Sequence, residues 1–439
     1  MNETANFPLV LIFTMYSNGE RHHHRNHKIM SRIVILLTIA LSSPIYAADW
    51  MQWRGPNHDG VSPETGLLQS WPEGGPKLLW QSENLGVGYS NIVFHDGKIF
   101  SMGDNKDACY LLALDAKNGD GLWAVKVGKS GGNYEGPRCT PATDGNLVFA
   151  IGQFGDFICA DVDGKLLWSV NVADEYGGKF MSSWNFSMSP IIDGNRVVLP
   201  IGGNGGTVIA FEKSDKGPKV LWQSKEFTEE AAYTSVVPMT FGGKKQYVVL
   251  TAERIAGLDP ENGKVLWQAP YPGERAVCSD PVYVMDGENT CYFMAACAYN
   301  VGAYGYKVTA KDGKFAAEEI YSDRSMQNHH GGIVQLGGHF YLLTQRELVC
   351  VNPKTGETLW KNRSVGKGSV FGVDGKLIAR SESGAGTVAL IEPSPEGYKE
   401  ISRFDQPDRT KNNSWTYPVV FEGKLYLRDQ HLLLCYELK

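Results

Sequence analysis

Two cysteines in the middle of the chain are spaced for covalent chemistry. If Asp286–Asn289 forms a four-residue loop, Met285 pairs with Thr290, and the same register sets Cys278 opposite Cys297. A one-residue slip would turn the two side chains to opposite faces, so the inference depends on the loop length. An exported compartment permits disulfide bonds. The spacing therefore predicts a Cys278–Cys297 disulfide.

The other cysteines point to packing rather than to chemistry. Three occupy a repeat position that Ala or Gly fills elsewhere, so we expect them to be small buried side chains: Cys159, Cys350 and Cys435. No partner can be derived for the remaining three, which are Cys109, Cys139 and Cys291. No Cys-x-x-Cys-His motif occurs, so covalently attached haem is not expected.

The adjacent histidines His329 and His330 raise the question of a metal site. Neighbouring residues on a strand point to opposite faces, which makes them poor joint ligands. We interpret them as a polar pair in a loop. No Ser-His-Asp arrangement, phosphate-binding glycine loop or His-Glu-x-x-His motif is apparent. The sequence therefore predicts neither a metal site nor a catalytic residue of these kinds.

The elements that must position any site are short strands in a repeated pattern. Residues Leu258–Trp267 show it fully: a strand ending in Leu-Asp, a turn with Pro, Asn and Gly, and a new strand ending in Val-Leu-Trp. Each turn residue has its own reason to favour a turn, and Val and Trp favour strands. The tryptophan recurs at Trp123, Trp168, Trp222, Trp267 and Trp360. Such a repeat decides the fold before any other feature.

The turns indicate how many units the repeat builds. Eight glycine turns, mostly Asp-Gly, mark a first hairpin. A second kind of glycine turn precedes the Trp strand in all units except the last, which ends at Lys439. The segment Pro76–Gln81, which contains Trp80, is a Trp strand standing alone. We predict an all-β fold: an eight-bladed β-propeller of four-stranded antiparallel blades over residues 76–439, its last blade closed by this N-terminal strand.

The N-terminus has the pattern of an export signal. Met30–Arg32 is basic, Ile33–Leu41 is apolar, and small residues follow up to Ala48, which is typical of a secretory signal peptide cleaved after Ala47. The apolar run is far shorter than the ~20 residues that span a bilayer, so no transmembrane segment is expected in the mature chain. We expect an exported protein, periplasmic or extracellular.

Two further segments flank that signal. Residues 1–29 are either a mis-called upstream extension, with translation starting at Met30, or a long n-region of the signal. Residues 1–47 are accordingly assigned to the signal peptide and its extension. Residues 48–75 form a leader rich in Trp, Pro and Gly, which we expect to pack against the propeller.

The charge balance limits the classes of partner that the protein is expected to bind. The formal net charge is −6 at pH 7, whereas a nucleic-acid-binding face is basic. We therefore expect no nucleic-acid partner. A protein or a small-molecule ligand on the loop face of the propeller is the predicted partner, and the chain is expected to be a monomer.

The repeats resemble the PQQ-type (pyrroloquinoline quinone) propeller repeat, in which a strand ending in Leu-Asp leads through a glycine turn to Leu-Trp. The resemblance covers residues 76–439, and the opening Trp53–Asn57 resembles the start of secreted bacterial PQQ-like propellers. That family is similar in fold to the outer-membrane assembly factor BamB and to quinoprotein alcohol dehydrogenases. The resemblance implies fold more than function, because one fold hosts many activities.

Two functions are compatible with the resemblance. The first is a non-catalytic secreted or periplasmic binding or scaffold protein without a cofactor. The alternative is an alcohol dehydrogenase-like oxidoreductase that uses PQQ and Ca²⁺. Quinoprotein alcohol dehydrogenases carry an adjacent Cys-Cys disulfide under the quinone, and no Cys-Cys pair occurs in this sequence. We also cannot place their Glu/Asn/Asp calcium ligands and Asp base, so the binding protein is the preferred interpretation.

The loops that enter the innermost strand of each blade open on one face of a propeller. In this sequence they are richer in Tyr, Trp, Asn and Arg than the opposite turns, and such residues dominate binding hot spots. Loops on a rigid scaffold often carry function. The alternative is that the aromatic side chains only fill the central channel. The predicted ligand or partner face consists of Tyr134, Arg138, Trp184, Asn185, Arg275, His330 and Trp415.

Overall fold

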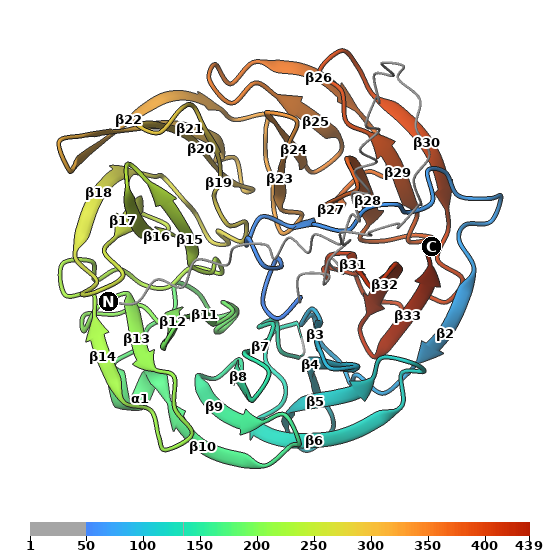
Figure 1. The fold of residues 1–439 in the computed structure, drawn as a ribbon, viewed down its shortest axis with the longest axis horizontal. Helices are drawn as coiled ribbons and strands as arrows, with labels where there is room; N and C mark the ends of the chain where they lie inside the picture. The colour runs from blue at the N-terminus through green and yellow to red at the C-terminus, as the bar shows by residue number, and fades with distance from the viewer. Residues whose placement is uncertain (1–49, 135) are drawn as a thin grey trace, which may run out of the picture. The chain divides into compact units, whose positions relative to one another are not determined.

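Eight small antiparallel sheets stand around a common centre in the computed structural model, which describes residues 50–134 and 136–439. The predicted signal peptide lies outside the described residues. Within the unit Tyr46–Lys439, the first strand of each blade lies toward the centre and the fourth lies at the rim (Figure 1). The predicted eight-bladed propeller is confirmed.

The first four blades follow the chain in order. Their strands are β3 (Val93–His95), β4 (Lys98–Asp104), β5 (Cys109–Asp115) and β6 (Gly121–Gly128); β7 (Ala142–Thr143), β8 (Leu147–Ile151), β9 (Asp156–Asp161) and β10 (Leu166–Asn171); β11 (Ile191–Asp193), β12 (Arg196–Pro200), β13 (Val208–Glu212) and β14 (Val220–Gln223); and β15 (Val237–Phe241), β16 (Lys244–Leu250), β17 (Arg254–Leu258) and β18 (Val265–Pro270).

The last four blades continue the same order. Their strands are β19 (Val282–Met285), β20 (Thr290–Cys297), β21 (Gly302–Lys311) and β22 (Lys314–Asp323); β23 (Ile333–Leu336), β24 (His339–Leu343), β25 (Leu348–Val351) and β26 (Thr358–Asn362); β27 (Gly368–Val373), β28 (Lys376–Ser381), β29 (Val388–Glu392) and β30 (Lys399–Phe404); and β31 (Val419–Phe421), β32 (Lys424–Asp429) and β33 (Leu432–Glu437) with β2 (Leu78–Ser82).

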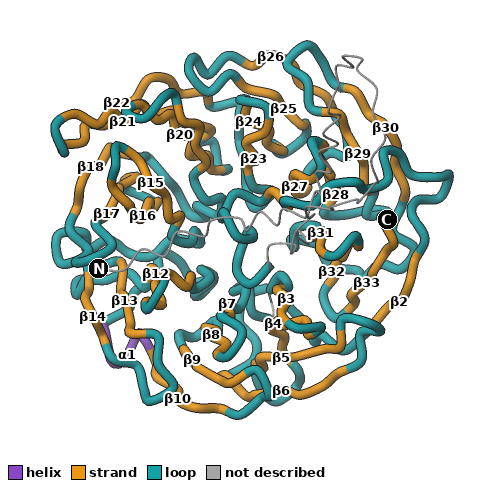
Figure 2. Tube along the Cα trace, in the orientation of Figure 1, coloured by secondary structure: helices purple, strands orange, loops and turns teal. Residues whose placement is uncertain are grey.

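Two N-terminal strands and one short helix complete the described part of the chain. β1 (Val61–Ser62) pairs in parallel with β27 as a fifth strand of the seventh blade. The helix α1 (Val172–Tyr176) follows β10 (Figure 2). It is capped by Asn171, whose side chain accepts hydrogen bonds from the amides of Ala173 and Asp174.

The ring is closed as the orphan Trp strand predicts. β2 pairs antiparallel with β33, and Trp80 stands opposite Cys435. The sheet order β2-β33-β32-β31 therefore joins the start of the propeller to its end. Closure leaves no open blade edge at this position, which removes a template for edge-to-edge pairing.

The turns adopt the conformations that their residues favour. Asp96 and Gly97 have φ values of 45° and 69°, and Asp374 and Gly375 have values of 48° and 69°. Positive φ at both central residues is the requirement of a type I′ hairpin turn, which suits the twist of the flanking strands. The Asp-Gly pattern was therefore a correct guide to these first hairpins.

The repeated tryptophan and the repeated turn glycine meet between neighbouring blades. A Cβ atom added to Gly164 would lie 2.6 Å from the Trp123 ring, and one added to Gly263 would lie 2.6 Å from the Trp222 ring. The Trp222 indole also donates to the Pro260 carbonyl at 2.9 Å. Each ring thus lies on the turn of the following blade, where only glycine leaves room for it.

The leader crosses the centre of the ring, where Figure 1 shows its blue trace. Its backbone and side chains bind the inner parts of successive blades. The carbonyls of Trp50 and Met51 accept from the amides of Phe94 and Thr143 at 2.7 and 2.9 Å. The indole of Trp53 donates to Asp280 at 2.6 Å. The leader therefore occupies the channel that the eight blades surround.

A buried arginine holds the middle of this leader. Arg54 is 4% exposed, and its guanidinium donates to the carbonyls of Asp59 and Ile333, each at 2.6 Å. The same group lies 5.8 Å from the centre of the Tyr417 ring. Burying a charge is costly unless it is hydrogen-bonded, and these carbonyl acceptors offset that cost.

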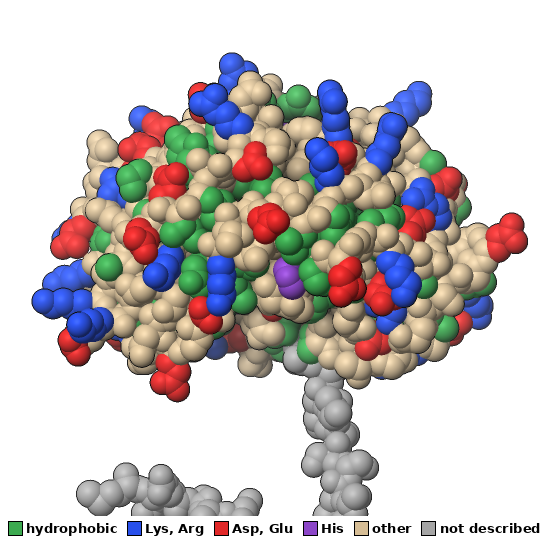
Figure 3. Space-filling view, turned by 90° about the horizontal axis from the view of Figure 1, so that it is seen from above, with side chains coloured by type: hydrophobic (Ala, Val, Ile, Leu, Met, Phe, Trp, Pro, Cys, Tyr) green, Lys and Arg blue, Asp and Glu red, His purple; other side chains and the backbone are tan. Residues whose placement is uncertain are grey.

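The outer side of the ring seen in Figure 3 carries charges of both signs. In the view of Figure 3, Lys and Arg side chains alternate with Asp and Glu side chains over this side. Many form exposed pairs, such as Lys399–Glu392 and Lys354–Asp286. Exposed pairs of this kind contribute only about 0–1 kcal/mol each, so the stability of the ring comes mainly from its buried apolar strands.

We predict that Gly263→Ala destabilises the protein more than Gly313→Ala does. Both glycines have φ of 71°, so both variants strain the backbone equally. At Gly313 no other atom lies within 4 Å of the new methyl group, whereas at Gly263 it meets the Trp222 ring. Overpacking costs about 1–3 kcal/mol. Thermal unfolding measures the difference, and equal melting temperatures would contradict the packing role.

Deletion of residues 48–84 should lower the melting temperature sharply. The deletion removes the closing strand β2 with Trp80, and it removes the leader from the channel. Trp80 is half-buried, but the deletion also removes the buried Trp50 and Trp71. Loss of one large buried aromatic side chain costs about 3–5 kcal/mol, against a typical domain stability of about 5–15 kcal/mol. Scanning calorimetry tests this, and a truncated protein that melts like the parent would refute closure.

Candidate functional site

A pocket of about 140 Å³ lies at the centre of one face of the propeller. It is lined by loops that precede the innermost strands of seven blades, by the β20–β21 loop and by the leader. Eight of the sixteen lining residues are Trp or Tyr, although aromatic residues make up 11% of the chain. The lining residues are Trp53, Tyr89, Tyr134, Arg138, Trp184, Ser187, Ser189, Tyr233, Ser235, Ala276, Cys278, Tyr299, His329, His330, Trp415 and Tyr417.

Five of the seven residues predicted for a binding face lie in this lining. The structure brings together Tyr134, Arg138, Trp184, His330 and Trp415. Asn185 does not line the pocket; it has a φ of 68°, and its carbonyl accepts from the Ser187 hydroxyl. Arg275 is exposed and lies 5.9 Å from the centre of the Tyr299 ring, outside the lining.

The remaining lining residues were not among the predicted site residues. Tyr89 and Tyr233 lie in inner-strand loops, so the loop rule could have included them. Tyr299 comes from the β20–β21 loop, which joins the second and third strands of its blade; such loops open on the same face, but no residue from them was included in the predicted site. Trp53 comes from the leader, and it meets Tyr417 edge-on with ring centres 5.1 Å apart. Since the leader fills the channel beneath, Trp53 forms a floor.

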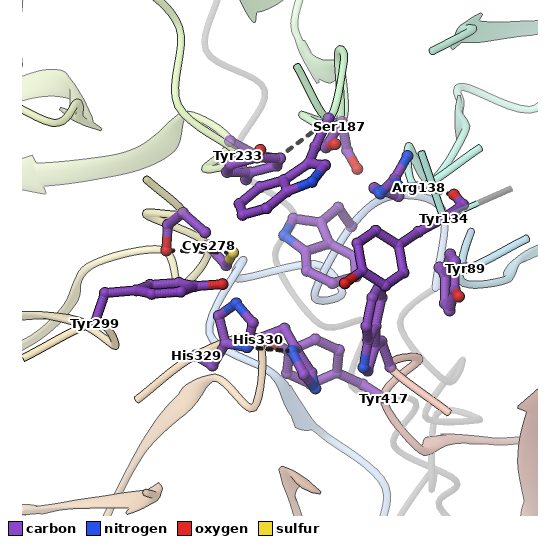
Figure 4. A pocket seen from close by; sticks show the side chains of 16 residues that line it. Tyr89, Tyr134, Arg138, Ser187, Tyr233, Cys278, Tyr299, His329, His330 and Tyr417 are labelled. Atoms are coloured by element: carbon purple, nitrogen blue, oxygen red, sulfur yellow. Dashed lines mark hydrogen bonds between the residues drawn. The ribbon is translucent and has the colours of Figure 1, made fainter. Parts of the chain in front are cut away.

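Rings on the two sides of the pocket pack in layers. Trp415 stacks on Tyr89 with ring centres 4.3 Å apart, and Tyr134 lies 5.3 Å from Trp415. Trp184 lies nearly parallel to Tyr299 at 6.4 Å. Figure 4 shows Tyr134 and Tyr299 on opposite sides of the open space. Tyr134 is 56% exposed, so its ring stands at the mouth rather than in the core.

Arg138 fixes the loop that carries Tyr134. Its guanidinium donates to the carbonyls of Asn133, Tyr134 and Gly136 at 2.7, 2.8 and 3.3 Å. Tyr134 itself has a φ of 57°, a conformation that bulky residues rarely adopt. Such strain persists only where surrounding contacts hold it, and it is frequent at binding sites. Arg138 is therefore a positioning residue, because its guanidinium group donates hydrogen bonds to backbone carbonyls.

The two histidines form a hydrogen-bonded chain with a glutamate. His330 Nε2 lies 2.6 Å from one Glu382 oxygen, and Lys367 Nζ lies 3.2 Å from the other. His330 Nδ1 lies 3.2 Å from His329 Nδ1. The interpretation of the two histidines as a polar pair in a loop is confirmed: they lie in the loop before β23, where strand alternation does not apply.

The protonation states follow from burial and from this chain. Burial, helped by the neighbouring His330, lowers the pKa of His329 to about 3, and burial also lowers the pKa of His330. Burial raises the pKa of Glu382, but the hydrogen bond from His330 and the charge of Lys367 outweigh it and bring the pKa to about 2. At neutral pH the pocket thus contains two neutral imidazoles beside an ionised carboxylate.

The cysteines behave differently from the prediction. Met285 pairs with Cys291 rather than with Thr290, so the loop has five residues, and the register that set Cys278 opposite Cys297 is wrong by one. Both are free thiols. Their sulfur atoms approach the same carbonyl, that of Ala276, at 3.5 and 3.3 Å.

The described cysteines also match the packing interpretation. Cys159, Cys350 and Cys435 are buried, as are the three for which no partner could be derived. Burial raises the pKa of Cys278, which lines the pocket, and raises the pKa of Cys297 to about 11, so both thiols are protonated at neutral pH. A protonated thiol is a weak nucleophile, so these residues add no reactive group to the pocket.

A metal-binding cluster is not found in the described part of the chain: no group of three or more His, Cys, Asp or Glu residues could hold an ion there. The carboxylates nearest the pocket are already bound. Asp280 accepts from the Trp53 indole at 2.6 Å and from the Ser235 amide at 2.7 Å. Glu382 is bound by His330 and Lys367.

In the part of the chain that the structure describes, no helix is both long and apolar enough to cross a bilayer.

Comparison with known proteins agrees with the repeat and the fold. Residues 107–299 match the family described as outer membrane protein assembly factor BamB. BamB of Burkholderia pseudomallei is 23% identical over 251 residues, or 57% of this chain; the match spans 59% of that protein, less than two thirds of its length. The chain is a β-propeller with BamB-like, PQQ-type repeats, as its repeat pattern predicts.

Two solved structures show the same architecture. Quinohemoprotein alcohol dehydrogenase from Comamonas testosteroni has a TM-score of 0.63 at 10% identity, covering 89% of this chain and 80% of that one. BamB from Moraxella catarrhalis has a TM-score of 0.51 at 16% identity, covering 80% of this chain and all of that one. At these identities the likeness shows the fold alone.

The lowered pKa of His329 predicts a pH dependence of stability. The folded state holds this imidazole neutral down to about pH 3, whereas the unfolded chain takes up a proton near pH 6.5. The contribution of the neutral His329 to the free energy of unfolding is therefore fully present above pH 6.5 and is lost as the pH drops toward 3. In a His329→Gln variant, the free energy of unfolding should depend on pH less steeply than in the parent, by up to about 1.4 kcal/mol per pH unit in this range.

Urea unfolding from pH 7 to pH 4 measures that slope. The matched control is His339→Gln, because His339 lies outside the pocket and bonds only the Gly337 carbonyl. This control should keep the parental slope. Burial also lowers the pKa of His58 to about 4, and this histidine adds the same pH dependence to the stability of all three proteins. Identical slopes for parent and His329→Gln would contradict a neutral buried His329.

Proposed function

We propose that this chain is an exported, non-catalytic binding protein whose central aromatic pocket receives a ligand or a segment of a partner. The observation that carries the proposal is the convergence of eight Trp and Tyr side chains from separate loops on one concave site. Exposed aromatic surface in a pocket is costly to leave in water and supplies large contact area on binding.

The rigidity of the site supports binding. Several lining or supporting residues are held in left-handed backbone conformations, with φ of 57° at Tyr134, 68° at Asn185 and 57° at Tyr299. Arg138 ties one of these loops through three hydrogen bonds. A preformed pocket loses less conformational entropy when a ligand binds.

The likeness to BamB supports an envelope or extracellular location. BamB is named as an outer membrane protein assembly factor, and the predicted signal peptide would direct this chain to the same side of the inner membrane. The proposal adopts the binding role and the location from this likeness, and it leaves the partner to be identified by the pocket.

The alternative, a quinone- and calcium-dependent dehydrogenase, has less support from the residues present. The pocket has no free pair of carboxylates for a calcium ion, since Asp280 and Glu382 are both bound to protein donors. Arg138, the cation in the lining, uses its donors on backbone carbonyls. The residues present therefore do not fit a polyanionic quinone with its calcium, and we propose no cofactor.

A photo-crosslinking experiment tests the binding role. Replacing Tyr134 by p-benzoylphenylalanine puts the reactive group at the mouth of the pocket, since Tyr134 is 56% exposed. The matched control places the same residue at Leu166, which is 45% exposed on the outer strand β10. In the exporting host, irradiation should give a defined adduct at position 134 and not at position 166.

The pocket aromatics should be needed for that adduct. Trp184→Ala should reduce the yield at position 134 at least tenfold, with a melting temperature close to the parental one because Trp184 is only partly buried. Trp415→Ala should reduce it too, but it should also lower the melting temperature because Trp415 stacks on Tyr89. An unchanged adduct in both variants, or a stoichiometric bound quinone after reconstitution with PQQ and calcium, would overturn the proposal.

A further inference from the structure

We propose that the ligand of the central pocket is a neutral saccharide, with one pyranose ring held between the aromatic walls and one of its hydroxyl groups donating to His329. This inference rests on the proposed function, because it names the class of ligand for the same site. Three features of the pocket lead to it: its ring faces, its lack of an available charge and the orientation of its histidine pair.

The walls offer flat faces with polar edges. Trp184 lies nearly parallel to Tyr299 on one side, and Trp415 stacks with Tyr89 near Tyr134 on the other. Tyr134 also meets Trp184 edge-on with ring centres 6.4 Å apart, so the two walls join at one end. A pyranose ring has an apolar face of C–H groups and an edge of hydroxyl groups. Aromatic faces bury the first, and tyrosine hydroxyls can donate to or accept from the second.

A cationic ligand does not suit these walls. Arg138 lies 5.8 Å from the centre of the Tyr89 ring, and Arg275 lies 5.9 Å from the centre of the Tyr299 ring. At Tyr89 and Tyr299 the attraction of the ring face for positive charge is thus already used by the protein's own cations. A second cation would be repelled by both guanidinium groups.

An anionic ligand lacks an available partner. Arg138 donates to three backbone carbonyls, and Lys367 is bound to Glu382 behind the histidines. The Glu382 carboxylate, 9% exposed, brings a negative charge close to the pocket. A ligand that is uncharged and carries many hydroxyl groups fits these conditions best.

The histidine chain presents an acceptor to such a hydroxyl group. The ionised Glu382 lies 2.6 Å from His330 Nε2, and a carboxylate this close favours the tautomer with the proton on Nε2, which leaves His330 Nδ1 with a lone pair. His330 Nδ1 then accepts from His329 Nδ1 at 3.2 Å. This leaves His329 Nε2 without a proton, as an acceptor on a ring that lines the pocket (Figure 4).

The size of the pocket agrees with a single ring. Its volume of about 140 Å³ is close to the about 150 Å³ of an engineered cavity that holds one benzene ring. The hydroxyl groups of Ser187 and Tyr233 also line the pocket; the first already donates to the Asn185 carbonyl and the second is hydrogen-bonded to Ser182, so Ser187 would meet the bound ring as an acceptor. The rest of an oligosaccharide would extend from the open mouth beside Tyr134.

Calorimetric titration of the full exported chain tests the ligand class. The probes are maltohexaose, cellohexaose, xylohexaose, mannohexaose and chitohexaose as neutral sugars, trigalacturonate as an acidic sugar, tetramethylammonium as a cation, and a Trp-containing peptide. We expect saturable binding of at least one neutral hexaose and at least tenfold weaker binding in Trp184→Ala.

Variants at His329 test its role as the acceptor. His329→Leu should weaken binding of the neutral sugar at least tenfold, whereas His329→Gln, whose side-chain oxygen also accepts, should stay within about threefold of the parent. His339→Leu, outside the pocket, should bind like the parent. Equal affinities for the Leu and Gln variants at position 329 would overturn the role of the acceptor.

The other outcomes separate this inference from the proposed function. Binding of trigalacturonate, tetramethylammonium or the peptide with no binding of a neutral sugar would overturn the saccharide assignment and leave the binding role intact. Failure of every probe, together with the absence of a crosslinked adduct at position 134, would overturn both.

Discussion

The contact between an outer-strand aromatic ring and the turn glycine of the next blade is the interaction on which the ring depends. It recurs where Trp80 lies over Gly119, Trp123 over Gly164 and Trp222 over Gly263. In the fifth blade Tyr321 takes the place of the tryptophan and lies over Gly356. Four blade junctions are fixed in this way, and the contact made by Trp80 of β2 joins the last blade to the first. At two other junctions the indoles of Trp168 and Trp360 donate to the carbonyls of Ser214 and Ser394 in the turn of the next blade. A closed ring exposes no terminal blade, and aromatic side chains of the outer strands hold most of its junctions.

The leader converts the ring into a scaffold with one usable pocket. Its buried Arg54 is held by backbone carbonyls, and Trp53 is anchored to Asp280. Because these residues occupy the channel, the loops above them surround a closed floor instead of a tunnel. The leader and the loops therefore define the pocket jointly, although they are far apart in sequence.

The electrostatics of the pocket contrast with the acidic character of the chain. The charged groups around it are used internally: Arg138 on carbonyls, Lys367 and His330 on Glu382. The side chains that remain available to a ligand are aromatic or carry hydroxyl groups, and they are neutral. The comparisons assign the fold and its repeats, and the properties of this pocket are the support for the proposed binding role among the activities that such propellers host.

The sequence by itself determined the architecture, because its determinants are local and repeated. Asp96-Gly97 and Leu258–Trp267 each encode a turn and its flanking strands within about ten residues, and the orphan Trp80 strand implies closure. It also placed Tyr134, Trp184 and Trp415 on one face, since every inner-strand loop opens there.

Only the tertiary structure decided which side chains meet. Tyr299 reaches the pocket from a loop between second and third strands, whose face is predictable but whose reach into the pocket is not. Trp53 enters from the leader and Arg275 is excluded from the lining, with no local signal for either. One extra residue in the β19–β20 loop overturned the cysteine register. Local turn chemistry fixes strands, whereas contacts across the ring depend on loop paths that a pattern of two or three residues does not encode.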